Sequence, residues 1–555
     1  MTRGHALGLD FGTESVRAVV LDLESGALTA TAVAPFPHGV IDRSLPEGGP
    51  SLPHDWALQD SDDWLTSMEH ATREALATAG VQPASVKGIG IDFTASTILP
   101  TTADGTPLHG IDALRAQPHA WPKLWKHHAA QAQADRINAV AARRAEKWLR
   151  RYGGKVSSEW LMAKALEMLD EAPEIYAAAE CIVEAGDWVV WRLTGSLARN
   201  ACAAGYKALW HKRDGYPSPD FLRDLDPGLE NLYTSKVRGQ VLAPGQVVGH
   251  LAPEWAQRLG LAEGTPVGSP MIDAHAAALG GGVSGPGTLF IVMGTSSCHL
   301  LLAEREVLVD GMSGVVEDGI VAGLFGYEAG QAGVGDIFAW FVRSGVPSAH
   351  DVVPSELADS GERAGLIHDV LSQRAAALAP GESGLLALDW WNGSRTPLVD
   401  ADLSGAILGY TLQTTPEAIY RALIEATAFG TRMIIDVFTE AGLAVDRVRV
   451  SGGLSRNELL TGIYADVTGL PFEICATDQA SGVGAAMLGA VAGGAFDRVD
   501  EAVRSLARPP ARIVPPDTSH RATYDALYGQ YVRLVDLFGR DPSSPLKQLR
   551  ALRAQ

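Results

Sequence analysis

The sequence has few cysteines and no long apolar run. Its four cysteines lie far apart and form no Cys-x-x-Cys pair, which argues against a disulfide framework and against a zinc site. No uninterrupted apolar stretch reaches the ~20 residues that a membrane-spanning helix requires. The apolar stretch near the N-terminus is too short for the core of a signal peptide. We therefore expect a cytoplasmic protein.

Basic residues are also in short supply. The chain carries 45 Lys and Arg against 65 Asp and Glu, a net charge of −20. Nucleic acids and anionic membranes are bound by clustered basic side chains, so neither is an expected partner. ATP is not excluded, because its phosphates are commonly bound by backbone N–H groups, one or two cations and Mg²⁺.

Two widespread nucleotide motifs are missing or misleading. No Gly-x4-Gly-Lys-Ser/Thr sequence occurs, which excludes a P-loop enzyme. Residues 280–285 (GGGVSG) match Gly-x-Gly-x-x-Gly, but Pro-Gly and a strand follow where a dinucleotide fold needs a helix.

The pair His127 and His128 has no Cys or carboxylate at a ligand spacing, so we expect no zinc there.

What the chain does have is length, apolar residues and glycine. At ~150 residues per domain, 555 residues predict two to four domains. Hydrophobic residues make up 46% of the chain, enough for large cores. The 60 glycines indicate tight turns or close approach of backbone to a ligand.

Alternating strands and helices predict an α/β protein. Pro/Gly-rich stretches at 244–249 and 260–270 are the candidate boundary between two halves. The region 121–191 is predicted to be mostly helical, and the chain from His520 onward forms an amphipathic helix. Other predicted strands cover 6–10, 16–21, 87–93, 447–451 and 471–475, and other predicted helices cover 456–468 and 482–492.

A strand–turn–strand pattern occurs twice. Residues 12–15 (GTES) and 294–297 (GTSS) each lie between two apolar, β-rich runs. The recurrence suggests two similarly folded domains, each of which offers one turn to a shared ligand. In the first turn Gly12 lets backbone approach an anion, Thr13 and Ser15 can donate to it, and Asp10 can hold a metal ion through water. The alternative is a plain hairpin turn.

The segment 452–457 has the composition of a binding site. Gly452 and Gly453, followed by Ser455 and Asn457 at the start of a helix, suit a nucleotide site. Capping of that helix by Ser455 is a compatible alternative.

Asp273, at the end of an apolar strand, is a candidate proton acceptor for a substrate hydroxyl. A helix N-cap is its structural alternative. We expect His275 to be structural. Lys207 and Glu328, among Gly and aromatic residues, suit a hydroxylated ligand.

Taken together, DFGTES, MIDAHAAALG, MGTSS and SGGLSRNELLTGIYADVTGLP resemble the FGGY carbohydrate kinases, over roughly residues 5–500. Within that family, GIDFTASTILP, LWKHHAA, YGGKVSSEW and CAAGYKALW are similar to bacterial L-ribulokinases rather than to glycerol or xylulose kinases. The resemblance implies two ribonuclease-H-like α/β domains of the actin and hexokinase type flanking a cleft. The sugar-binding domain would span 1–268, and the nucleotide-binding domain with its helical tail would span 269–555.

The resemblance also implies roles for individual residues. Asp273 matches the general base, and Asp10 and Asp273 lie where the family holds Mg²⁺. The residues that match sugar contacts are Ala95, Lys207, Asp273 and Glu328. Those that match ATP contacts are Gly12, Thr13, Ser15, Gly294, Thr295, Gly452, Gly453 and Asn457.

The implied activity is MgATP-dependent phosphorylation of L-ribulose to L-ribulose 5-phosphate, a step of L-arabinose catabolism. Xylulose or ribitol is the alternative substrate, and an actin-like ATPase without a sugar substrate is the alternative class. The expected partners are the sugar and ATP, and a homodimer is compatible with the sequence.

Overall fold

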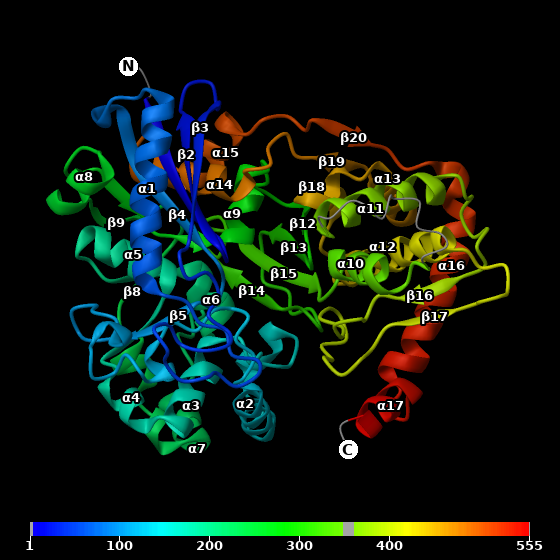
Figure 1. The fold of residues 1–555 in the computed structure, drawn as a ribbon, viewed down its shortest axis with the longest axis horizontal. Coiled ribbons are helices and arrows are strands. Elements are labelled where there is room, and N and C mark those ends of the chain that lie inside the picture. The colour runs from blue at the N-terminus through cyan, green and yellow to red at the C-terminus, as the bar shows by residue number, and fades with distance from the viewer. Residues whose placement is uncertain (1–3, 348–359, 554–555) are drawn as a thin grey trace.

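Two mixed β-sheets organise the chain into two lobes (Figure 1). The computed structural model describes residues 4–347 and 360–553. The first sheet has the strand order β3-β2-β1-β4-β10-β9, with β11 also paired to β4. Its strands are β1 (His5–Phe11), β2 (Ser15–Asp22), β3 (Leu28–Pro35), β4 (Val86–Phe93), β9 (Val247–His250), β10 (Pro266–Gly268) and β11 (Met271–Ile272).

The second sheet repeats the first. Its order is β14-β15-β13-β12-β18-β19-β20. In each sheet the first strand, β1 or β12, pairs antiparallel with the next strand in sequence and parallel with a strand that arrives much later, β4 or β18. Both predicted hairpins and the internal repeat are therefore confirmed. The strands are β12 (Gly287–Met293), β13 (Ser297–Ala303), β14 (Gly314–Glu317), β15 (Phe325–Gln331), β18 (Val445–Ser451), β19 (Phe472–Ile474) and β20 (Arg512–Val514).

A helical subdomain extends from the first lobe. The predicted helical region 121–191 is interrupted, because Ala145 has a φ of 53° and a 3₁₀ turn, Lys147–Tyr152, follows the end of α2. The helices of this lobe are α1 (Ser61–Ala79), α2 (Gln131–Arg143), α3 (Leu161–Glu171), α4 (Pro173–Ala178), α5 (Ala185–Thr194), α6 (Ala201–Ala208), α7 (Pro219–Leu225) and α8 (Pro253–Leu259). Short strand pairs join β5 (Ile98–Thr101) to β6 (Cys181–Glu184) and β7 (Ala198–Asn200) to β8 (Gln240–Leu242).

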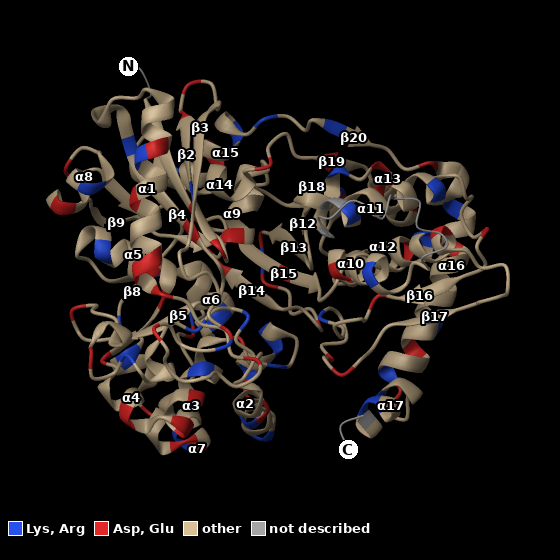
Figure 2. Cartoon of the chain, viewed as in Figure 1, with Lys and Arg blue, Asp and Glu red and all other residues tan. Residues whose placement is uncertain are grey.

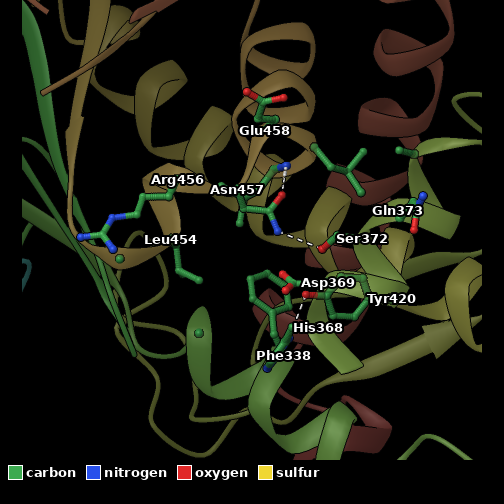
Figure 3. A pocket seen from close by; sticks show the side chains of 15 residues that line it. Phe338, His368, Asp369, Ser372, Gln373, Tyr420, Leu454, Arg456, Asn457 and Glu458 are labelled. Carbon is green, nitrogen blue, oxygen red and sulfur yellow. Dashed lines mark hydrogen bonds between the residues drawn. The ribbon is translucent and has the colours of Figure 1, made fainter. Parts of the chain in front are cut away.

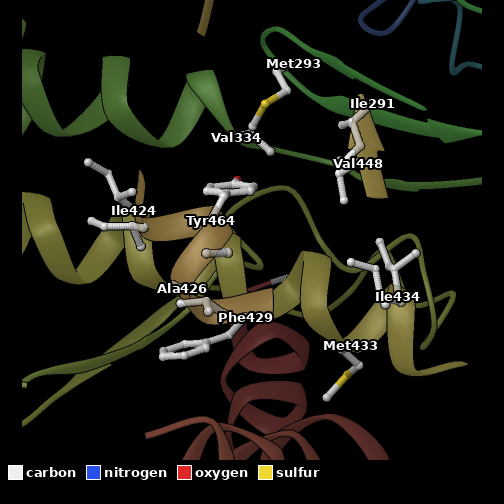
Figure 4. Close-up of a cluster of buried hydrophobic side chains, with 14 of the residues drawn as sticks. Ile291, Met293, Val334, Ile424, Ala426, Phe429, Met433, Ile434, Val448 and Tyr464 are labelled. Carbon is white, nitrogen blue, oxygen red and sulfur yellow. The ribbon is translucent and has the colours of Figure 1, made fainter. Parts of the chain in front are cut away.

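The core of the second lobe forms around its longest helix, α12 (Pro416–Glu440). Figure 4 shows Ile424, Phe429 and Ile434 of this helix with Ile291 and Val448 of the sheet. The tail helix packs there too, as its tyrosines Tyr524, Tyr528 and Tyr531 lie near the Phe429 ring. The remaining elements are α10 (Gly335–Ser344), α11 (Ser360–Ala376), α13 (Glu458–Thr468), α16 (Arg521–Leu534), α17 (Pro545–Arg553), β16 (Leu386–Leu388) and β17 (Ala406–Leu408). None of the described helices has the length and apolarity to cross a membrane.

Helices from the second half of the chain cover the first sheet. In Figure 1, α14 (Ala480–Ala492) and α15 (Val499–Leu506), in orange, lie beside the blue strands, and α9 (Asp273–Gly280) adjoins them. A Cβ on Gly8 or Gly90 would lie 2.1 or 1.8 Å from a carbonyl oxygen of α14, so these strands need glycine to admit the helix. Much of the glycine therefore serves packing of backbone on backbone rather than contact with a ligand.

The predicted division after residue 268 lies within the first sheet. That point falls between β10 and β11, which both pair with β4 of the first sheet. The first sheet continues through Ile272 because β11 extends it, and α14 then adds a layer from the other half of the chain.

Candidate active site

Three carboxylates meet at one edge of the first sheet. Asp10 and Asp92 are paired in register near the carboxyl ends of the parallel strands β1 and β4. Asp273 directly follows β11, which is parallel to β4. The carboxyl ends of parallel strands lie at the same edge, where ligands of α/β proteins commonly bind.

Burial and mutual repulsion raise the pKa values of Asp92 and Asp273 at this acidic edge. Asp10 accepts a hydrogen bond from the Arg17 guanidinium at 2.9 Å. Asp92 is 0% exposed, and within the described chain its two carboxylate oxygens have no hydrogen-bond partner. Burial, followed by the negative charges of Asp10 and Asp273, raises the pKa of Asp92 well above its usual value. Such a group is better satisfied once a cation is nearby.

Asp273 is the accessible member of the three. It is partly exposed and is the first residue of α9, while Ile272 occupies the N-cap position without a side-chain hydrogen bond. The predicted N-cap alternative is therefore wrong: within the described chain, the carboxylate accepts from the neighbouring N–H of Ala274, at 2.7 Å, and caps no later N–H of the helix. Burial raises the pKa of Asp273 to about 7, with Asp10 acting in the same direction. A carboxylate with a pKa near neutrality is suited to take a proton.

An ion pair connects the two lobes beside Asp273. Lys207 on α6 donates to both carboxylate oxygens of Glu328 on β15, at 2.8 and 2.9 Å, and both side chains are buried. Burial alone would raise the pKa of Glu328, but Lys207 and then His275 lower it overall. The His275 ring lies against Tyr206, with centroids 4.4 Å apart, and its Nε2 is 3.4 Å from Glu328. Asp273 interacts electrostatically with both members of the pair.

Ala95, the remaining predicted sugar contact, is partly exposed in the turn after β4. It packs against the apolar cluster that contains Tyr206 and Ile272. The predicted sugar contacts thus come from the same region of the molecule, although they are far apart in sequence.

The first Gly-Thr turn is fastened by side chains. Gly12 donates its N–H to Ser15 O at 3.0 Å, closing the turn. Gln59 Nε2 donates to Thr13 O at 2.7 Å, and Trp125 Nε1 donates to Thr13 Oγ1 at 3.1 Å. A Cβ on Gly12 would meet only one atom, at 3.5 Å, so the backbone here is open to a ligand.

The second turn is fastened by backbone instead. Gly294 O and Thr295 O accept hydrogen bonds from N–H groups at the start of α10, at 2.8 to 3.2 Å. Thr295 is exposed. Asp273 interacts electrostatically with Asp10, which precedes the first turn, and with Cys298, which follows the second. It therefore lies within electrostatic range of both hairpins.

Gly452 packs directly behind the second turn. Its φ is 94° and its ψ 169°, a region that is essentially restricted to glycine. A Cβ there would lie 2.3 Å from Met293 O. The helix that follows begins at Glu458 and is capped by Asn457, whose side chain accepts from Leu460 N at 3.0 Å. The predicted cap, Ser455, is wrong: it lies in a 3₁₀ turn and donates to Gly452 O.

A cavity of 560 Å³ opens next to these glycines. In Figure 3, the Asn457 side chain points to Ser372 of α11, and its amide donates to Ser372 Oγ at 2.9 Å. The His368 ring and the Tyr420 hydroxyl form a hydrogen bond on the same side of the cavity. Gly453 and Gly335 complete the link to the second turn, since Gly335 N donates to Gly294 O. The volume of the cavity is in the range of small-molecule binding sites.

Several residues of the site were missed from the sequence, Asp92 first among them. A signal for it existed, because Leu-Asp-Phe at 9–11 and Ile-Asp-Phe at 91–93 are the same pattern at the ends of two buried strands. Gln59, Trp125 and the cavity residues of α11 had no local signal, since only the tertiary fold brings them to the turns.

Two repeated α/β lobes, each with a turn of this kind, are the architecture of the actin- and hexokinase-like ATPases. The fold resembles that of xylulose kinase from Rhodospirillum rubrum, with a TM-score of 0.77 at 23% identity over 96% of this chain and 98% of that one. It also resembles Plasmodium falciparum glycerol kinase with ADP, with a TM-score of 0.74 at 16% identity over 96% and 98%.

The chain belongs to the FGGY family of carbohydrate kinases. The family's N-terminal domain matches residues 5–280 and its C-terminal domain matches residues 289–493. The ribulokinase of Shouchella clausii is 50% identical over 99% of this chain and 98% of its own length. The ribulokinase of Mycolicibacterium smegmatis is 47% identical over 99% and 96%.

Proposed function

We propose that this carbohydrate kinase phosphorylates a ketopentose, L-ribulose, to L-ribulose 5-phosphate with ATP as the donor. The observation that carries the proposal is near-full-length similarity to ribulokinases at about half identity. The geometry supports it through a partly exposed Asp273 beside the buried pair Lys207–Glu328. Opposite charges at fixed positions suit a ligand that is rich in hydroxyl groups.

In this mechanism Asp273 is the general base. Its Oδ1 accepts from Ala274 N, and the carboxylate would accept the proton of the sugar's terminal hydroxyl as that oxygen attacks the γ-phosphate and ADP leaves. Lys207 would donate to a sugar oxygen and Glu328 would accept from a sugar hydroxyl, which fixes the orientation of the acceptor. Phosphoryl transfer depends mainly on such positioning and on charge neutralisation.

ATP would occupy the cavity at Asn457 and extend toward the two turns. Its base would lie between α11 and Gly453, and the open backbone of Gly12, Thr13, Gly294 and Thr295 would receive its phosphates. Backbone N–H groups in such turns bind anions without a basic side chain.

The acidic edge fits Mg²⁺, because it offers carboxylate oxygens, the ligands that this ion prefers. Asp10 and Asp273 would hold it, and its positive charge would favour ionisation of the buried Asp92 beside Asp10. Bound there, Mg²⁺ would neutralise charge on the phosphates. A cytoplasmic location and the absence of nucleic-acid and membrane partners complete the proposal.

The test is ADP release with MgATP and a panel of L-ribulose, D-ribulose, xylulose, ribitol and glycerol. Release that depends on L-ribulose, with the product identified as the 5-phosphate, is the expected result. Preference for xylulose or ribitol would transfer the proposal to that substrate. ATP hydrolysis that no sugar stimulates would overturn it in favour of an actin-like ATPase.

A further inference from the structure

Lys164 is a buried lysine whose hydrogen bonds all go to backbone carbonyls. It lies on α3 and is 0% exposed. Its Nζ donates to Ser96 O at 2.7 Å and to Leu124 O at 2.8 Å, and Lys123 O lies at 3.5 Å. Among the residues that the structure describes, no carboxylate forms an ion pair with it.

An ammonium group in this position is unfavourable for stability alone. Moving a charge out of water is costly unless an opposite charge compensates, and an apolar side chain of similar volume often serves stability equally well. Burial lowers the pKa of Lys164 to about 7, while the more distant Glu159 and Glu184 act in the opposite direction. The geometry of its three acceptors therefore calls for a different explanation.

The first acceptor belongs to the turn next to the sugar contacts. Ser96 has a φ of 54°, a left-handed conformation that is strained for a residue with a Cβ. Its hydroxyl is buried and has no partner in the described structure. Ala95, the proposed sugar contact, directly precedes it. The Ser96 carbonyl is bonded, and that bond comes from Lys164.

The second acceptor belongs to the loop that reaches the first Gly-Thr turn. Leu124 O bonds to Lys164, and the next residue, Trp125, donates its indole N–H to Thr13 Oγ1 at 3.1 Å. Residues 98 and 123 pair through their backbones, so the two segments already lie side by side. The Lys164 ammonium therefore joins the Ser96 turn, beside the proposed sugar contacts, to the loop whose Trp125 supports the first Gly-Thr turn.

We propose that Lys164 is a positioning residue for the sugar: its ammonium holds Ser96 in the left-handed conformation and fixes the Ala95 backbone relative to the Trp125 loop. The inference rests on the proposed function of the site. Lys164 does not touch the substrate. Its loss affects the affinity for the sugar more than that for ATP, because the Ser96 turn adjoins the sugar contacts, while ATP is reached only indirectly, through the Trp125 support of the first turn.

The experiment compares Lys164→Met with a matched control, Lys123→Met. Lys123 is equally buried, but its ammonium pairs with Glu167 at 2.6 Å rather than with the sugar turn. In Lys164→Met we expect the sugar KM to rise roughly 10- to 100-fold, the range for losing hydrogen bonds to a charged group, with a smaller rise in ATP KM and a Tm close to wild type. In Lys123→Met the buried Glu167 carboxylate loses its ammonium partner and keeps the His127 ring, 2.9 Å away, so Tm falls while the sugar KM stays near wild type.

A second variant tests the conformational argument. Glycine adopts the left-handed region at no steric cost, so Ser96→Gly in the Lys164→Met background should recover part of the sugar affinity. A purely structural lysine predicts no such rescue. Should Lys164→Met not fold, Lys164→Gln, which keeps one donor for one carbonyl, takes its place with a smaller expected rise in sugar KM.

The outcomes separate this inference from the proposed function. If none of the tested sugars stimulates ADP release by the wild type, the proposed function fails. If the wild type phosphorylates a sugar and Lys164→Met keeps the wild-type sugar KM, or raises the KM of ATP as much as that of the sugar, the positioning role is overturned. A selective rise in sugar KM with partial rescue by Ser96→Gly supports it.

Discussion

The two lobes share a strand pattern but differ in what they carry at the ends of equivalent strands. Before its turn the first sheet has Asp10, paired with Asp92, while the second sheet has Val292 at the corresponding position, paired with Ser451. The second lobe has instead Gly452 and a cavity. Under the proposed function, one backbone scaffold would support proton and metal chemistry on one side and nucleotide binding on the other.

The turns differ in their support as well. The first depends on single side chains, Gln59 and Trp125, whereas the second depends on backbone N–H groups of α10. Point mutations can therefore disturb the first turn directly, but they reach the second mainly through the backbone. Figure 2 shows that charged residues lie over both lobes, so net charge does not distinguish them; placement at the strand ends does.

The largest expected effect comes from removing the base. Asp273→Asn should lower kcat by ~10²–10⁴-fold, the usual contribution of general-base catalysis, with little change in sugar Kd. Steady-state kinetics with calorimetric sugar binding measures both. A variant that keeps more than about a tenth of wild-type kcat would contradict the assignment, because that loss is far smaller than expected for a base.

The next effect tests the acidic edge. Asp10→Asn should weaken the response to Mg²⁺ by roughly 10- to 100-fold, the loss typical of residues that support a metal site. Titration of activity with Mg²⁺, and of Mn²⁺ binding by electron paramagnetic resonance, measures it. Arg17→Met is the control, since it removes the Asp10–Arg17 pair but keeps the carboxylate. An equally weakened response to Mg²⁺ in both variants would mean that the Asp10–Arg17 ion pair matters and that the Asp10 carboxylate does not hold the metal.

A third change tests whether the second lobe depends on its backbone. Gly452→Ala should lower stability by about 1–3 kcal/mol, because its backbone conformation is restricted to glycine and the Cβ overlaps Met293 O. The second turn is displaced with it, so the KM for ATP should rise. Gly12→Ala, at the equivalent turn of the first lobe, meets no close atom and should leave Tm unchanged. Equal Tm values for the two variants would contradict the proposed difference between the supports of the two turns.

The smallest effect is a pH dependence that belongs to the first lobe alone. Asp273 must be ionised to act as a base, and its pKa is raised to about 7. The sugar kcat/KM should therefore fall about tenfold per pH unit below that value. Since the raised pKa penalises the charged form in the folded state, Asp273→Asn should raise Tm more at pH 8 than at pH 5. A flat profile between pH 5 and 8 would refute this prediction.

Local patterns predicted the hairpins, the glycine turns and Asp273, because strand alternation and strand ends can be recognised in short segments. The Ser455 cap was wrong since a 3₁₀ turn moves the helix start to Glu458. The covering of the first sheet by α14 was missed, although Gly88 and Gly90 on one face of β4 were a signal for close approach of a helix. Pairing between elements hundreds of residues apart leaves little trace in any short window.

The position of α14 has a consequence for biosynthesis. The strand β4 leaves the ribosome about 400 residues before the helix that covers it, and at roughly 5–20 residues per second the delay is about 20–80 s. During that time the glycine-lined face of the nascent sheet lacks its final layer. A chain truncated before residue 480 should therefore require chaperones and aggregate, even though it contains every strand of the first sheet.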